Sequence, residues 1–164
     1  MIYILAALLL FGGVHIAYSS NLQSTTKWLG ERISEKEIIM TTPSSYSTSL
    51  EIQTMVTPPK QKIRILLTLL IYLATFVVGL LLAWWVSIIA LILLFACSAL
   101  VSFIFLPRKA DYWIKLVMIG LQNRISDYEK NGDHGRAENL SDFIPILDEW
   151  VEYSKAHNLD INKI

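Results

Sequence analysis

Few residues in this chain have side chains that could catalyse a reaction or bind a metal ion, and their spacing does not match that of a catalytic site. His134 lies between Asp133 and Glu138, and His157 lies three residues before Asp160. Imidazole and carboxylate groups can bind a metal ion, but neither cluster has the paired-histidine or cysteine-rich spacing of a zinc site. An Asp-His-Gly stretch is typical of a solvated turn. The sequence therefore predicts no metal site.

Other catalytic patterns are also missing from the sequence. It contains no Gly-x-Ser-x-Gly elbow and no phosphate-binding glycine loop. Cys97 is the only cysteine, which excludes a disulfide within the chain and any two-cysteine redox motif. The net charge is zero, which argues against a nucleic-acid partner. We therefore expect no catalytic residue and no cofactor, and we predict that the chain is not an enzyme.

His15 lies inside an apolar segment and has two interpretations. An ionisable group within a membrane span is by default a candidate proton relay or ligand. His15 is also close to the end of its segment, where it can reach the membrane interface together with Tyr18. No Asp or Glu occurs in residues 1–26 or 65–107, so a relay has no acidic partner there. We favour the interfacial interpretation and predict that Tyr18 is an interfacial residue.

The charges are segregated along the chain. Residues 27–64 contain six basic and four acidic residues, and residues 108–164 contain eight basic and ten acidic residues. Between these blocks, residues 65–107 form an uncharged run of 43 residues rich in Leu, Ile, Val, Phe and Ala. Such a run is too long for a helix of a soluble core. The sequence predicts an all-α integral membrane protein.

The 43-residue run must cross a membrane twice. As one helix it would extend about 65 Å, whereas the hydrocarbon core is about 30 Å thick. Two halves, Ile65–Ala83 and Trp85–Leu106, each fit one crossing. Trp84 and Trp85 then lie at the junction, at the headgroup level where indole rings accumulate. We predict a transmembrane helical hairpin over 64–107, with a shallow re-entrant hairpin as the alternative.

Basic residues suggest the orientation. Lys60, Lys62 and Arg64 precede the hairpin and Arg108 and Lys109 follow it, so both ends are predicted to be cytoplasmic.

Residues 1–18 are predicted to be a further transmembrane segment with its N-terminus outside. A cleaved signal peptide is the alternative, but the segment lacks the usual positively charged beginning. The chain is thus expected to be a multi-pass protein of an inner or plasma membrane with a cytoplasmic C-terminus.

The remaining segments are predicted to be cytoplasmic. Residues 19–63 form a loop with an amphipathic helix over Trp28–Met40 and a Ser/Thr-rich extended part. Within that part, residues 50–57 alternate as in a β-strand, although a flexible linker is equally compatible. Residues 108–164 form a helical tail with helices over Ala110–Lys130 and Asp142–Ala156, the second capped by Ser141.

Small residues recur along the predicted hairpin and aromatic residues lie outside it. Small side chains at helical spacing let helix backbones approach closely, either within the hairpin or against partner spans. Tryptophans are enriched where binding energy concentrates. The predicted helix-packing residues are Thr75, Gly79, Ala83, Ser98 and Ser102, and the predicted partner-docking residues are Trp28, Trp113 and Trp150.

These features favour a non-catalytic small membrane subunit that anchors or assembles a larger complex. Its partners would be the lipid bilayer and other membrane-protein subunits or further copies of itself. The alternative is a membrane-permeabilising, holin-like effector, a class that needs little more than hydrophobic spans and a charged tail. Few polar residues in the spans could line an aqueous pore, which weighs against that alternative.

Overall fold

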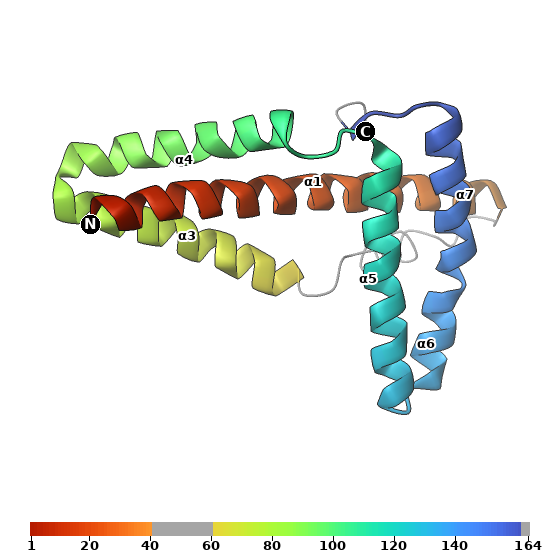
Figure 1. The fold of residues 1–164 in the computed structure, drawn as a ribbon. Helices are drawn as coiled ribbons and strands as arrows, with labels where there is room; N and C mark the ends of the chain where they lie inside the picture. Colours follow the sequence, from red (N-terminus) through yellow and green to blue (C-terminus); the bar gives the residue numbers. More distant parts are fainter. Residues whose placement is uncertain (41–60, 162–164) are drawn as a thin grey trace. The chain divides into compact units, whose positions relative to one another are not determined.

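A computed structural model describes residues 1–40 and 61–161, and these residues are predominantly helical (Figure 1). The predicted all-α fold is confirmed for this part of the chain, in which the only β-type pairing is an isolated antiparallel bridge between Lys109 and Asp160. The alternating segment at 50–57 and the Pro58-Pro59 spacer lie outside the described residues. The helices are α1 (Ile2–Met40), α3 (Gln61–Leu82), α4 (Trp84–Ile104), α5 (Ala110–Lys130), α6 (His134–Ser141) and α7 (Phe143–Ala156).

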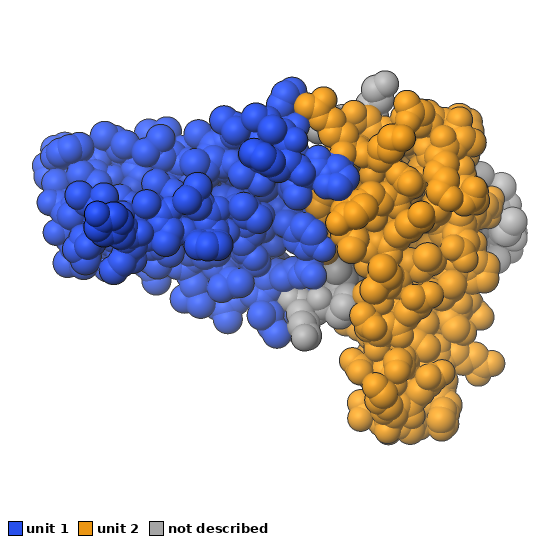
Figure 2. Space-filling view, in the orientation of Figure 1, with its two compact units in different colours: residues 1–21, 60–107 blue, residues 22–59, 108–164 orange. Residues whose placement is uncertain are grey.

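The chain divides into two compact units, coloured separately in Figure 2. Unit 1 comprises residues 1–21 and 60–107, and unit 2 comprises residues 22–59 and 108–164. Three helices are long and apolar enough to cross a membrane, namely the first 31 residues of α1 together with α3 and α4. The three spans predicted from the sequence therefore correspond to three helices of suitable length and composition.

Helix α1 is continuous over 39 residues, where the sequence suggested a span ending at residue 18 and a separate helix from Trp28. The intervening residues contain neither Gly nor Pro, so nothing in them breaks a helix. The hydroxyl group of Thr26 is satisfied by the helix itself, since its Oγ1 donates to the carbonyl oxygens of Leu22 and Gln23 at 3.1 and 2.9 Å. One helix therefore contributes to both units.

Helices α3 and α4 form the predicted hairpin, and a single residue links them. Ala83 is extended, with φ −170° and ψ 151°, so the link lies just before the predicted Trp84-Trp85 junction. The turn uses its own backbone: the Ala83 N–H donates to the Gly79 carbonyl and the Val86 N–H to the Ala83 carbonyl, both at 3.0 Å. An apolar turn of this kind therefore needs no Asn or Asp side chain.

Gly79 allows the two backbones of the hairpin to touch. A Cβ atom at Gly79 would lie 2.5 Å from the Cα atom of Ser87, closer than real side chains approach. Since the neighbouring atom is backbone, it cannot rotate away. The close approach of α3 to α4 just before the link thus depends on glycine.

Unit 1 has small and polar side chains inside and large apolar ones outside. The side chains of Thr75, Ser87, Ala90, Leu94 and Ser98 are buried. The exposed side chains of α3 and α4 include Leu69, Leu73, Leu81, Ile92, Phe95 and Phe103. Water-soluble proteins bury large apolar side chains, whereas helices in lipid bury small ones. The distribution is that of helices surrounded by hydrocarbon.

In unit 2, α5 packs against α6 and α7. The predicted helix over Ala110–Lys130 is confirmed, and it ends at a turn in which Gly132 has φ +77°. The first half of α5 buries one side against α6 and α7, while Tyr112 and Ile119 on another side stay exposed. Its buried side chains include Trp113, Ile114, Val117 and Leu121, which are joined by Ala137, Leu140, Leu147 and Val151 from α6 and α7.

The boundary between α6 and α7 differs from the sequence expectation. Ser141 is the last residue of α6 and donates to the Glu138 carbonyl at 2.7 Å, while Asp142 occupies the cap position of α7 without a side-chain hydrogen bond. The proposed Ser141 cap is therefore wrong. Pro145 explains the break, because a proline ring clashes with the carbonyl four residues earlier and prevents one continuous helix.

Replacing Gly79 by Leu is expected to destabilise unit 1. The new side chain must displace the Ser87 backbone, and overpacking of this kind costs about 1–3 kcal/mol. Thermal unfolding of the full chain in detergent, followed by circular dichroism, measures the effect. Ala99→Leu is the matched control because Ala99 is exposed on α4. Equal stability of the two variants would contradict the backbone contact.

Candidate functional site

The polar side chains inside unit 1 are bonded to their own helices. Thr75 Oγ1 donates to the Ile71 carbonyl at 2.8 Å, and Ser98 Oγ donates to the Phe95 carbonyl at 2.8 Å. Ser87 Oγ donates in the same way to the Trp84 carbonyl at 2.6 Å. A hydroxyl occupied in this way is small and locally satisfied. These residues therefore serve helix packing.

Helix α1 joins the hairpin through two adjacent glycines. A Cβ atom at Gly12 would lie 2.7 Å from Ile71 Cγ2, and one at Gly13 would lie 3.1 Å from Cys97 Cβ. The same Cβ atom at position 13 would also lie 3.4 Å from the Ser98 backbone nitrogen. This pair was not among the helix-packing residues predicted from the sequence, although two consecutive glycines in an apolar helix are a recognisable signal for close helix contact.

The structure places the predicted helix-packing residues as follows. Thr75, Gly79 and Ser98 are buried inside unit 1, while Ala83 is half-buried and forms the link. Ser102 is half-buried, and its hydroxyl donates to Asn21 Oδ1 at 3.1 Å, which ties α4 to α1.

Ser87 and Ala90 were missed by the sequence analysis, although they continue the Ser98 stripe at spacings of one helical turn. The predicted Ser98-Ser102 pair is thus part of a longer stripe on α4.

The predicted interfacial residues lie at opposite ends of unit 1. Trp84 and Trp85 are at the hairpin turn, with 72% and 54% of their surface exposed. Tyr18 is half-buried, and the guanidinium carbon of Arg64 lies 5.6 Å from the centre of its ring. Both placements fit aromatic side chains at two membrane surfaces.

Three polar atoms near the Tyr18 end are buried without a hydrogen-bond partner among the described residues. They are His15 Nε2, Ser19 Oγ and Arg64 Nη1. A buried donor without an acceptor is costly, by about 1–3 kcal/mol. These are the least satisfied polar groups in the described part of unit 1.

The three tryptophans predicted to dock partners have different environments. Trp28 of α1 and Trp150 of α7 contact each other edge to face, with ring centres 5.4 Å apart. Both are half-buried and keep an exposed edge. Trp113 is fully buried in unit 2, so it stabilises the fold and is not available to a partner in this conformation.

The polar clusters of unit 2 have structural roles. Asp133 caps α6, since its carboxylate accepts the Arg136 backbone N–H at 3.4 Å and pairs with Arg136 Nε at 3.3 Å. His157 Nδ1 lies 2.9 Å from the Tyr153 carbonyl oxygen, and its ring packs on the Tyr153 ring. Among the described residues, no group of three or more His, Cys, Asp or Glu could hold a metal ion.

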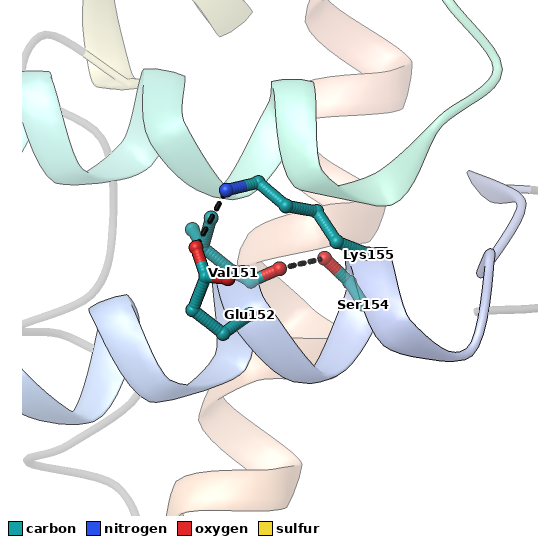
Figure 3. Close-up of polar contacts among 4 residues, drawn as sticks. All are labelled: Val151, Glu152, Ser154 and Lys155. Atoms are coloured by element: carbon teal, nitrogen blue, oxygen red, sulfur yellow. Dashed lines mark hydrogen bonds and ion pairs between the residues drawn. The ribbon is translucent and has the colours of Figure 1, made fainter.

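An exposed ion pair on α7 shifts the pKa values of its two side chains. Lys155 Nζ donates to Glu152 Oε1 at 2.5 Å, next to the hydroxyl of Ser154, which donates to the Val151 carbonyl (Figure 3). This hydrogen bond lowers the pKa of the Glu152 carboxyl and raises the pKa of the Lys155 amine. Both groups are exposed and remain charged near neutral pH, which is typical of a solvated helix face.

Comparisons with protein-family models, with curated proteins and with solved structures give no significant match for this chain. A functional proposal therefore rests on the geometry. That geometry consists of small-residue helix contacts in unit 1, a tryptophan pair in unit 2 and three unsatisfied polar atoms at one end of unit 1.

The α1 contact can be tested with the native cysteine. Gly13→Cys is expected to form a disulfide with Cys97 on mild oxidation, because the two Cβ positions are 3.1 Å apart and need to separate by only a few tenths of an ångström to reach the spacing of this bond. Val14→Cys is the matched control, since the Val14 side chain is exposed. Mass spectrometry of tryptic peptides identifies the linked pair. Disulfides formed only between chains, or equally by both variants, would contradict this packing of α1.

Proposed function

We propose that this chain is a non-catalytic membrane subunit that anchors or assembles a larger protein complex. The observation that carries the proposal is the continuity of α1, whose 39 residues contribute to both units. Its first part packs on the apolar hairpin through Gly12 and Gly13, and its second part contacts α7 through Trp28. A helix shared in this way would connect a membrane anchor to a helical unit that partners can bind.

The environment of the polar groups supports a structural role. The three buried hydroxyls in the hairpin each donate to a carbonyl of their own helix, which satisfies their donor groups without a ligand. The apolar side chains on the outside of unit 1 suit contact with lipid or with other spans. In this proposal, the outer surfaces of the chain carry its function, and an internal site does not.

The proposed orientation follows from the basic residues. Lys62 and Arg64 lie before the hairpin and Arg108 and Lys109 after it, on the side that the positive-inside rule assigns to the cytoplasm. The Trp84-Trp85 turn and the N-terminus then lie outside. Unit 2, including the C-terminal helices, is cytoplasmic in this proposal, and the membrane is an inner or plasma membrane.

Unit 2 would supply the docking surface. Trp28 and Trp150 each keep an exposed edge, and α5 exposes Tyr112 and Ile119 two turns apart on one face. Exposed aromatic and aliphatic side chains of this kind anchor helix-helix contacts between proteins. The partners are proposed to be other membrane-protein subunits or further copies of this chain.

The same packing weighs against a pore-forming effector. A pore needs polar side chains directed at water, and Thr75, Ser87 and Ser98 instead face neighbouring helices with their hydroxyls occupied. A pore would therefore require rearrangement of unit 1 or assembly through its apolar outer surface.

The membrane potential and the co-purifying proteins of cells that express this chain distinguish the complex subunit from the pore-forming effector. We expect the membrane potential, followed with a voltage-sensitive dye, to be unchanged on expression, and a fixed set of proteins to co-purify in mild detergent. Ile119→Glu should reduce that co-purification, because a charge on an apolar contact is costly. Gln122→Glu, also at an exposed position on α5, is the control. Rapid depolarisation would favour the pore-forming effector. If this chain purifies as a monomer without any other protein, its assignment as a complex subunit is contradicted.

A further inference from the structure

We propose that unit 1 binds the headgroup of an anionic phospholipid through Arg64, with Ser19 and His15 as additional donors. The starting observation is that Arg64 Nη1, Ser19 Oγ and His15 Nε2 are buried without a hydrogen-bond partner among the described residues. All three groups can donate a hydrogen bond, the imidazole in the tautomer that carries its proton on Nε2. The missing acceptor is therefore expected to come from outside the chain.

Helix register brings the three groups together. Ser19 is two turns from Gly12 on one face of α1, and Arg64 is two turns from Ile71 on one face of α3. Since Gly12 meets Ile71 and Tyr18 meets Arg64, the helices are antiparallel and Ser19 lies at the level of Arg64. His15 is one turn from Ser19, toward the middle of the helices.

The charge of this site is uncompensated within unit 1. Residues 1–21 and 61–107 contain no Asp or Glu, so no carboxylate of these segments can neutralise the Arg64 guanidinium. The aromatic ring of Tyr18 attracts the Arg64 cation, but it does not accept hydrogen bonds from the N–H groups of the guanidinium. A partly buried guanidinium matches the geometry of a phosphate, which accepts two parallel hydrogen bonds.

The depth of Arg64 points to lipid phosphate rather than free phosphate. From Arg64 to Trp84 the chain rises about 30 Å, the thickness of the hydrocarbon layer. With the Trp84-Trp85 turn at one surface, Arg64 lies at the opposite surface, where the phosphates of the headgroups begin. Basic sites between helices at the cytoplasmic surface bind anionic headgroups in this way.

The arrangement of the donors matches the order of groups in a phospholipid. Arg64 and Ser19 lie at one level and can hold the phosphate oxygens. His15, about 6 Å deeper by the helical rise, lies where the ester carbonyls of the glycerol begin. Arg64, Ser19 and His15 are all half-buried, so part of each side chain is exposed, and a side-chain rotation would bring its buried donor atom to an approaching lipid.

Lipid titration of the full chain tests this site. The purified protein in detergent is titrated with phosphatidylglycerol or phosphatidylcholine, and bound lipid is counted by native mass spectrometry. Both lipids carry phosphate, but choline cancels its charge. We expect phosphatidylglycerol to bind about fivefold more tightly, the factor that corresponds to the attraction of one basic side chain to an anionic headgroup. Arg64→Gln should remove this preference, and Ser19→Ala should weaken the binding of both lipids a few-fold.

Lys62→Gln is the control, because it removes a nearby charge from an exposed side chain. A preference that persists in Arg64→Gln, or that falls equally in Lys62→Gln, would overturn the site in favour of diffuse surface charge.

If inorganic phosphate binds while phosphatidylglycerol does not, the assignment of the acceptor to a lipid is overturned. A photoreactive residue at position 19 that cross-links to a protein rather than to lipid would assign the acceptor to a partner. Circular dichroism shows which variants remain folded. If Arg64→Gln does not fold, the lipid affinity of Ser19→Ala still tests the site.

Discussion

The thickness of a bilayer is the constraint from which most of this structure follows. Helices α3 and α4 have 22 and 21 residues, lengths that match a hydrocarbon layer of about 30 Å. The link between them is then restricted to one residue, Ala83, flanked by aromatic rings suited to a headgroup region. Helix α1 exceeds this thickness, and its charged second half belongs to unit 2 instead.

Packing inside unit 1 follows from the same environment. Between helices in lipid, burial of apolar surface provides little driving force, so close backbone contact and local hydrogen bonds must hold the helices together. Gly79 beside Ser87 and Gly13 beside Cys97 provide the backbone contacts, and the bond from Ser102 to Asn21 adds a polar one. The unsatisfied donors around Arg64 mark the end at which this packing is incomplete without an external acceptor.

Length and charge made the spans and the hairpin predictable from the sequence, because a 43-residue uncharged run admits few folds. The helix over Ala110–Lys130 was predictable for a similar reason, since its buried stripe is regular and a Gly-containing turn ends it. The continuity of α1 was not predictable, because a polar stretch such as Ser24–Lys27 resembles a loop, and the sequence does not show that the Thr26 hydroxyl bonds to the helix itself.

Tertiary contacts were the least predictable features. Trp113 resembled a docking residue, and only the packing of α6 and α7 on α5 shows that it is buried. The pairing of Trp28 with Trp150, distant in sequence, has no local signal at all. Gly12 and Gly13 did have a signal, but the surfaces they approach on α3 and α4 depend on register, which composition does not specify.

Labelling from outside the cell tests the central claim, a three-span anchor with a cytoplasmic helical unit, most directly. Single cysteines are placed at Lys27, Trp84 and Asn131 in a chain carrying Cys97→Ala, all at exposed positions. A membrane-impermeant maleimide applied to intact cells should label only the cysteine at position 84. Labelling at position 131 from outside, or none at position 84 in intact cells but full labelling after lysis, would contradict the account.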